Sequence, residues 1–505
     1  MKRIGLATML MTSSALVCAT AATMPNNANL SQAALPQVKD SWYQSGQQAL
    51  AAAKAKRPID KPAKNIILFI GDGMSVGTLT AARIYQGQQQ GMTGEEHSLV
   101  LESLPHVALS KTYNTDMQTP DSAGTATAMV AGVKTKAGVI SGNDKVQRGF
   151  CNTLKGNQVE TLFESAAQQG RAIGVVSTAR ITHATPATAY AHSADRGWEN
   201  DAAMTPIAKK QGCVDIAQQL VDFDWGNGLE VVLGGGRREL MLNSQNDPEY
   251  ADKKGKRKDG QDLIAQWQQR YPQGEYVWNK AGFDAVSKNL PERVLGLFEP
   301  SHMQYEADRD SSKEPSLAEM TKLAVEMLSR DQQGYVLMVE AGRIDHAHHA
   351  GNAARALQDT LAFDAAIAQA LAMTNPQETL IIVTADHAHT LIANGYADRG
   401  NPILGLSKKQ GKLNLGDDGK PYTTLAYGNG PGAQAGERSK LNEQQVQQLD
   451  YLQQALVPLA ASETHSGEDV AILASGPKAW LFQGVVEQHY IYHVMREALG
   501  MNAAP

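Results

Sequence analysis

Several segments of this chain are apolar along most of their length, and this pattern constrains the fold more than any other feature. Such runs occupy residues 65–70, 172–177, 229–233, 335–339, 379–384 and 469–473. A strand that is apolar on both faces belongs in a sheet covered by helices on both sides. Helix-like stretches separate the runs, at residues 77–89, 159–169, 316–328, 352–371 and 485–499. The alternation predicts an α/β fold with a large, mostly parallel central sheet and helices on both faces.

Acidic residues and histidines follow three of these predicted strands. Asp72 follows the first run, Glu340 and Asp345 follow the fourth, and Asp386 and His387 follow the fifth. In open α/β sheets, ligands bind at the carboxyl ends of the strands, so these side chains can converge on one pocket. For any single strand the alternative is a turn former or a helix cap. The recurrence at three strand ends favours a metal site.

Two further histidines extend this candidate metal site. His349 lies four residues after Asp345, which on a helix places both side chains on one face, where they can bind one ion. His465 adds another imidazole ahead of the last apolar run. Asp, Glu and His ligands without Cys suit zinc together with magnesium and exclude a thiolate-type structural zinc site. The alternative for the histidine-rich segment after Asp345 is a solvated helix face.

Ser122 is the candidate nucleophile. It precedes a run of small residues that can start a helix, and the N-terminus of a helix favours an anion. A nearby metal ion can activate a serine hydroxyl without a neighbouring base. The alternative is a serine that only caps the helix.

The charge balance limits the possible partners. The chain has 505 residues, with 46 Lys and Arg against 52 Asp and Glu, a formal net charge of -6 and a pI near 6.1. This balance disfavours binding a polyanion by bulk charge, so we predict no nucleic-acid-binding module. If the protein handles an anion, its positive charge must be local, from metal ions, a few arginines or a helix N-terminus.

The N-terminal segment predicts export. Lys2 and Arg3 precede an apolar stretch over residues 4–17, and small residues follow it. This order predicts a secretory signal over residues 1–21 and a periplasmic or secreted protein. The alternatives are a buried N-terminal helix and a lipoprotein anchored at Cys18. No later apolar run is long enough to span a bilayer, and the last residues lack a hydrophobic tail, so we expect no membrane anchor.

Export also bears on the cysteines. Once the signal is removed, Cys151 and Cys213 remain as a pair in an oxidising compartment, without the spacing of a redox or zinc motif. A disulfide is the favoured interpretation, and two free buried thiols are the alternative.

Six motifs between residues 65 and about 498 resemble the alkaline phosphatase family, in order: NIILFIGDGM, PDSAGTATA, THATPATAYAHSADR, LMVEAGRIDHAHH, VTADHAH and ETHSGEDV. The resemblance is to the animal-type branch and includes LGGGRR at 233–238. It implies hydrolysis of a broad range of small phosphomonoesters through a phosphoserine at Ser122, with release of inorganic phosphate. It also implies a homodimer.

The resemblance implies a role for each site residue. It places one zinc ion on Asp345, His349 and His465, and a second on Asp72, Asp386 and His387, with Ser122 as its labile ligand. It places magnesium on Asp72, Thr185 and Glu340. Arg196 would bind two phosphate oxygens as a bidentate fork. Three residues would lie beside these groups without binding substrate: Asp121, His183 and His346.

Two further expectations concern calcium and the domains. The resemblance implies a calcium site at Glu249, Phe298, Glu299 and Glu314, although the family has Asp where this chain has Glu314. A longer side chain can still reach a flexible calcium sphere. The domains expected are a signal peptide at 1–21, an N-terminal extension at 22–64, an α/β phosphatase core at 65–389 and 465–500, and a small crown-like insert at 390–464.

Competing functions predict other residues. A sulfatase needs C-x-P-x-R or S-x-P-x-R, which the residues after Ser122 do not match. A phosphodiesterase or phosphoglycerate mutase would lack Arg196 and the magnesium ligands. A metal-binding module without catalysis predicts the loss of a ligand or of the nucleophile, and all of them are present in the sequence.

Overall fold

The computed structural model describes residues 36–501, and the chain divides into two compact units, Met1–Arg57 and Pro58–Pro505. In the first unit, the 3-10 helix η2 (Pro36–Lys39) precedes α1 (Ser41–Ala55), which Asp40 caps by accepting a hydrogen bond from the amide of Trp42 at 2.8 Å. No residue of α1 is buried. The predicted signal peptide and Cys18 lie outside the described residues.

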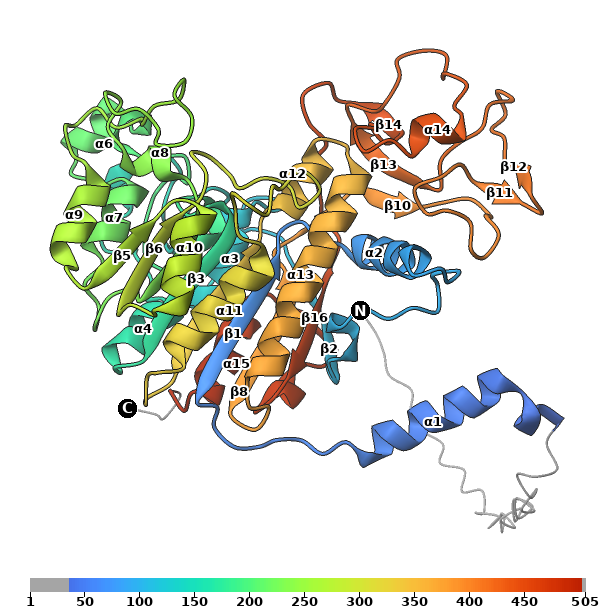
Figure 1. The fold of residues 1–505 in the computed structure, drawn as a ribbon, viewed down its shortest axis with the longest axis horizontal. Coiled ribbons are helices and arrows are strands. Elements are labelled where there is room, and N and C mark those ends of the chain that lie inside the picture. Colours follow the sequence, from blue (N-terminus) through green and yellow to red (C-terminus); the bar gives the residue numbers. More distant parts are fainter. Residues whose placement is uncertain (1–35, 502–505) are drawn as a thin grey trace, which may run out of the picture. The chain divides into compact units, whose positions relative to one another are not determined.

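The second unit is built on one sheet of ten strands (Figure 1), in the order β17-β2-β16-β8-β1-β7-β3-β4-β6-β5. The strands from β8 to β5 are parallel, β16 is antiparallel to both of its neighbours, and β17 is parallel to β2. The prediction of a mostly parallel sheet is confirmed. The strand bounds are β1 Asn65–Gly71, β2 His106–Lys111, β3 Ala172–Arg180, β4 Val231–Gly235, β5 Gly274–Val277, β6 Arg293–Leu297, β7 Tyr335–Ala341, β8 Thr379–Ala385, β16 Val470–Ser475 and β17 Val485–Glu487.

The register of the central strands positions the candidate site. Gly71, the last residue of β1, pairs with Ala341 at the end of β7 and with Ala385 at the end of β8. Since the three strands are parallel, their carboxyl ends lie level at one edge of the sheet. The residues that follow them therefore come together there.

Helices cover both faces of the sheet, as predicted. Along β1, Ile66, Leu68 and Ile70 pack in one apolar cluster, and Ile67 and Phe69 pack in the other. This alternation follows from the period of two of a strand, and burying each of these side chains contributes about 1.5–3 kcal/mol. The first cluster includes residues of α3 (Ser122–Ala131), α4 (Leu162–Gln168) and α15 (Tyr490–Ala498). The second includes residues of α2 (Val76–Gln89), α11 (Leu317–Leu328) and α13 (Ala353–Met373).

The second unit also contains shorter helices. One of them, α12 (Arg343–His349), follows β7 directly. The others are α5 Ala184–Ala187, α6 Pro206–Lys210, α7 Ile216–Asp222, α8 Arg237–Leu240, α9 Leu263–Arg270, α10 Lys280–Lys288 and α14 Glu443–Val446, with 3-10 helices η3 Leu101–Ser103, η4 Cys151–Thr153, η5 Asp201–Ala203 and η6 Ala479–Leu481.

Residues after β8 form small sheets of their own, drawn in orange in Figure 1. β9 (Ala388–His389) pairs with β15 (His465–Ser466), and the chain between them holds a three-stranded sheet and a hairpin. These comprise β10 Leu391–Ala393, β13 Leu425–Gly430 and β14 Ala455–Pro458, and the hairpin strands β11 Lys408–Lys409 and β12 Lys412–Leu413. Small sheets that are separate from the ten-stranded sheet fit an inserted subdomain in this stretch.

The predicted disulfide between Cys151 and Cys213 is present, with 5.9 Å between the two Cα atoms. It lies in a separate apolar cluster with residues such as Val146, Ala194 and Trp198. Within residues 36–501, no helix is long and apolar enough to cross a membrane.

Candidate metal and phosphate site

A tight turn after β1 brings Asp72 into the interior. Gly73 has φ +71°, which glycine adopts without strain, and its amide donates to Asp386 Oδ1 at 3.0 Å. A Cβ on Gly73 would lie 2.4 Å from the His389 ring. Asp72 and Asp386 are therefore fully buried side by side at the ends of β1 and β8.

The first group of candidate ligands is Asp345, His349 and His465. Asp345 and His349 are both on α12, and His349 Nε2 lies 3.4 Å from Asp345 Oδ1. His465 Nε2 lies 3.4 Å from the same oxygen and 3.1 Å from His349 Nε2. Burial opposes ionisation of Asp345, but the surrounding histidines outweigh it and hold the pKa of Asp345 well below its usual range.

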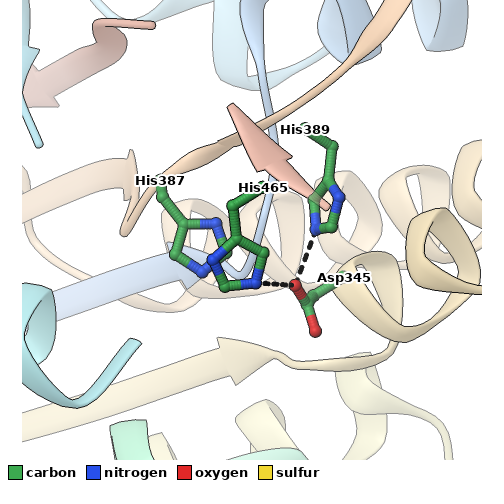
Figure 2. A group of neighbouring side chains, drawn as sticks. All are labelled: Asp345, His387, His389 and His465. Atoms are coloured by element: carbon green, nitrogen blue, oxygen red, sulfur yellow. Dashed lines mark hydrogen bonds and ion pairs between the residues drawn. The ribbon is translucent and has the colours of Figure 1, made fainter. Parts of the chain in front are cut away.

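His389 belongs to this group, although no role was predicted for it from the sequence. Figure 2 shows its ring pointing at Asp345, to which His389 Nε2 donates at 2.6 Å. Its other ring nitrogen meets the carboxylate of Glu463. These two carboxylates raise the pKa of His389 to about 9, against the effect of burial. The available signal was the His387-x-His389 spacing, which places both rings on one side of an extended segment.

The second group is Asp72, Asp386 and His387, and Ser122 lies against it. His387 Nε2 is 3.2 Å from Asp386 Oδ2 and 3.5 Å from Asp72 Oδ1. Ser122 Oγ is 3.2 Å from the same nitrogen. Ser122 is buried as the first residue of α3, and Asp121 caps the helix by accepting from the amide of Gly124 at 3.1 Å.

The third group is Asp72, Thr185 and Glu340. Among the described residues, neither carboxylate oxygen of Asp72 has a hydrogen-bond partner, and neither do Thr185 Oγ1 and Glu340 Oε1. Burial raises the pKa of Glu340 to about 7, and burial with the neighbouring carboxylates of Asp345 and Asp386 raises the pKa of Asp72 well above its usual value. Buried oxygens with no donor and mutually repelling carboxylates require cations to stay ionised. The residues present therefore fit bound metal ions.

Arg196 contacts Asp121, the residue before Ser122, which lies against the second group. Its NH1 donates to Asp121 Oδ2 at 3.0 Å, and its NH2 lies 3.2 Å from His183 Nε2. Its backbone amide donates to the carbonyl of Gly138 at 2.8 Å. Asp121 therefore connects the cap of α3 to the arginine that is expected to hold phosphate.

His183 and His346, predicted beside the metal groups, form a cluster with His302. Ring centroids lie 5.3 Å apart for His183 and His302, and 4.0 Å for His302 and His346. Both ring nitrogens of His302 face hydrogen-bond donors of Arg180, its backbone amide and its guanidinium. His183, His302 and His346 bring their ring nitrogens close enough together to be a further candidate metal group. His302 gave no signal in the sequence because it stands alone there.

Two of the four predicted calcium residues share a hydrogen-bond donor, and the other two make separate contacts. Gln304 links the two acids Glu299 and Glu314, donating from Nε2 to the first at 3.1 Å and from its amide to the second at 3.2 Å. Burial raises the pKa of Glu314 to about 8. Glu249, in contrast, accepts from Arg237 at 2.9 Å. Phe298 is buried, and its amide donates to Gly234.

Comparison with known proteins bears on this site. A family model described as alkaline phosphatase matches residues 63–501. The tissue-nonspecific alkaline phosphatase of Gallus gallus is 46% identical over 474 residues, which cover 92% of this chain and 90% of that protein. The alkaline phosphatase of Gadus morhua is 43% identical over 471 residues, covering 91% of this chain and 97% of that protein.

Solved structures show the same fold. The alkaline phosphatase of Thermus thermophilus superposes with a TM-score of 0.63 at 25% identity, covering 90% of this chain and 94% of that one. The alkaline phosphatase of the Antarctic bacterium TAB5 superposes with a TM-score of 0.60 at 22% identity, covering 88% and 99%. With the family model and close relatives aligned over most of its length, the chain belongs to the alkaline phosphatase family and is a metal-dependent phosphomonoester hydrolase.

Proposed function

We propose that the chain hydrolyses phosphomonoesters through a phosphoserine on Ser122, with two zinc ions and one magnesium ion bound at the strand ends. The observation that carries the proposal is the position of Ser122. Its Oγ lies 3.2 Å from a candidate ligand nitrogen of His387, at the N-terminus of α3. The nucleophile and the ligands thus meet although β1, α3 and β8 are far apart in the sequence.

The first zinc ion would be held by Asp345, His349 and His465, the second by Asp72, Asp386 and His387, and magnesium by Asp72, Thr185 and Glu340. When bound, such ions lower the pKa of hydroxyl groups and offset the charge on the attacking and leaving oxygens. A mutant of the TAB5 alkaline phosphatase has been solved with Mg bound in its M3 site, so magnesium is an ion that a protein of this fold binds.

The chain's own residues then bind and orient the ester. The guanidinium of Arg196 would hold two phosphoryl oxygens. Its NH1 donates to Asp121 Oδ2 at 3.0 Å, and this hydrogen bond orients the guanidinium. Ser122 Oγ loses its proton and forms a bond to phosphorus as the bond to the leaving oxygen breaks, and the departing alkoxide takes up a proton to leave as the alcohol. In the second step a water oxygen loses a proton and attacks phosphorus, the Ser122 ester bond breaks, Ser122 Oγ regains a proton, and inorganic phosphate leaves. The buried position of Ser122 limits the access of bulk water to the phosphoserine.

Substrate range follows from what these groups contact. The proposed ligands and Arg196 all address the phosphoryl group rather than the alcohol. We therefore expect a broad range of small phosphomonoesters as substrates, with inorganic phosphate as product and inhibitor.

A calcium ion at Glu249, Phe298, Glu299 and Glu314 is a further part of the proposal. Glu299 and Glu314 are both buried, and carboxylate and carbonyl oxygens are the ligands that calcium takes. The pKa of Glu314, which burial raises to about 8, would return toward its usual range beside a cation. Thermal melting with and without a calcium chelator tests this site.

Export and a homodimer complete the proposal. A signal peptide at 1–21 and a disulfide both fit a periplasmic or secreted protein. The proposed insert at 390–464 exposes large apolar side chains, with Tyr396 84% and Leu456 82% accessible. Exposed apolar side chains gathered on one subdomain fit an interface with a second copy of the chain. The phosphatase core would then be residues 65–389 and 465–500, preceded by an extension at 22–64.

The proposal is tested with Ser122→Ala. We expect this variant to keep its zinc, to lose most turnover of a chromogenic phosphomonoester, and to trap no phosphate after rapid acid quenching. Ser165→Ala, another buried serine but located in α4, is the matched control and should keep both. Turnover by Ser122→Ala equal to that of the control would refute the nucleophile assignment.

A further inference from the structure

The chain returns from the small sheets to the core at Glu463, which is 1% exposed. It lies two residues before His465, whose strand β15 pairs with β9 so that His465 is opposite His389. Gly430, at the end of β13 with φ +135°, packs closely against Glu463: a Cβ on this glycine would lie 3.0 Å from Glu463 Cβ. Glu463 therefore stands at the point where the two ends of the proposed insert meet the first ligand group.

The carboxylate of Glu463 joins the two ends of the proposed insert. One of its oxygens is hydrogen-bonded to His389 Nδ1. The other accepts from the backbone amide of Thr390 at 2.8 Å and from Thr390 Oγ1 at 2.5 Å. His389 Nε2 in turn donates to Asp345 Oδ1 at 2.6 Å. The orientation of Asp345 thus depends on His389, and that of His389 on Glu463.

The backbone of Glu463 acts on a second member of the group. Its carbonyl accepts from His349 Nδ1 at 2.6 Å, and its amide donates to the carbonyl of His349 at 2.9 Å. Because Nδ1 then carries the proton, Nε2 keeps its lone pair. That nitrogen is the one that faces Asp345 Oδ1 at 3.4 Å and His465 Nε2 at 3.1 Å.

We infer that Glu463 is a positioning residue of the first zinc group, holding Asp345 through His389 and His349 through its own backbone. The inference rests on the proposed function, which assigns Asp345, His349 and His465 as ligands. Groups that hold metal ligands in place contribute to affinity because the ligands are then already arranged for the ion. Glu463 also couples the base of the proposed insert to the metal group.

The test is zinc affinity, measured on the full chain by competition with a chromophoric chelator. Glu463→Gln keeps the size of the side chain but places an NH2 group against one of the groups that face the carboxylate, either His389 Nδ1 or Thr390. We expect the zinc ion of the first group to bind about 10- to 100-fold less tightly than in the wild type, and excess zinc to restore kcat. Glu164→Gln is the matched control: Glu164 is buried in α4 and also accepts from a histidine, His192, at 2.8 Å and from a backbone amide, that of Thr161, at 2.8 Å.

A purely structural role for Glu463 predicts a different result. In that case Glu463→Gln and Glu164→Gln would lower the melting temperature of the metal-free protein alike, and zinc affinity would stay within threefold of the wild type in both; that result overturns the inference. Thr390→Val removes only one contact to Glu463, so it should weaken zinc binding by a smaller factor even if Glu463→Gln folds poorly. His465→Ala separates the two proposals: if it binds zinc as the wild type does, the ligand assignment itself is wrong.

Discussion

Removal of the disulfide has consequences that the structure allows us to work out. The bond joins Cys151 to Cys213 across 62 residues, and its Cα atoms are 5.9 Å apart, inside the usual range for disulfides. For a loop of this length the chain-entropy model predicts a stabilisation of about 4 kcal/mol, because the bond restricts the unfolded chain. We expect Cys151→Ala combined with Cys213→Ala to lose about that much free energy of unfolding.

The same bond lies near Arg196, which we propose to hold phosphate. Its apolar cluster includes Ala194 and Trp198, which flank Arg196, and the Arg196 amide donates to Gly138 at 2.8 Å. The double variant should therefore raise KM for phosphomonoesters a few-fold, with little change in kcat once the enzyme is saturated. A tenfold change in KM would correspond to about 1.4 kcal/mol, so most of the lost stability should not appear in binding.

The assay is urea unfolding at fixed zinc and magnesium concentrations, followed by fluorescence and by residual activity. Wild type treated with a phosphine reductant should match the double variant, and the double variant should not respond to the reductant. A double variant within about 1 kcal/mol of the wild type would show that the loop is constrained in the unfolded state by other means, and would refute the entropic argument.

Three other predictions follow from single contacts. Asp121→Asn weakens the hold on Arg196 at 3.0 Å, so inhibition by inorganic phosphate should weaken about tenfold; unchanged inhibition would contradict the contact's role. Phe363→Ala removes a fully buried ring that stacks edge-on with Phe69 at 5.9 Å, and urea unfolding should show a loss of about 3–5 kcal/mol. Burial raises the pKa of Glu230 from 4.5 to about 7, so its ionisation costs stability as pH rises through that range. The free energy of unfolding of Glu230→Gln should therefore exceed that of the wild type by about 3 kcal/mol at pH 9 and match it near pH 4, as measured by melting curves across pH.

The strands that the sequence indicated are mostly buried on both faces, although β6, which is buried as well, was not predicted. The runs at 66–70 in β1 and 335–339 in β7, for example, are apolar without interruption and lie in the middle of the sheet, so their composition alone distinguishes them. Glu340, expected to follow its strand, is instead part of β7. β2 was not predicted: Val107 and Leu109 are 56% and 38% exposed, and the strand lies near the edge of the sheet. The predicted helix at 485–499 was wrong at its start, where Val485–Glu487 pairs with β2 before α15 begins. Pairing with a neighbouring strand decided that segment, not its own propensity.

The candidate site divides in the same way. Asp72 and Asp386 were predicted because each comes directly after a strand whose end can be read from its composition. The contacts of His389 reach across 44 residues to Asp345 and across 74 residues to Glu463. The His387-x-His389 spacing indicated only that the two rings lie on one side, and nothing local indicated their partners. His302 likewise acquires its contacts only through the fold.

The sequence by itself determined which side chains are available at the strand ends, because an uninterrupted apolar run followed by an acid defines the strand to within two residues of its end. It also indicated the helix that carries Ser122 and the pair of cysteines. Only the tertiary structure decided which of these groups meet, since the register of β1 with β7 and β8 sets which strand ends lie level. The hydrogen bonds that orient the ligands likewise required the folded chain, because each joins side chains that are distant in sequence and becomes favourable only when both are buried together.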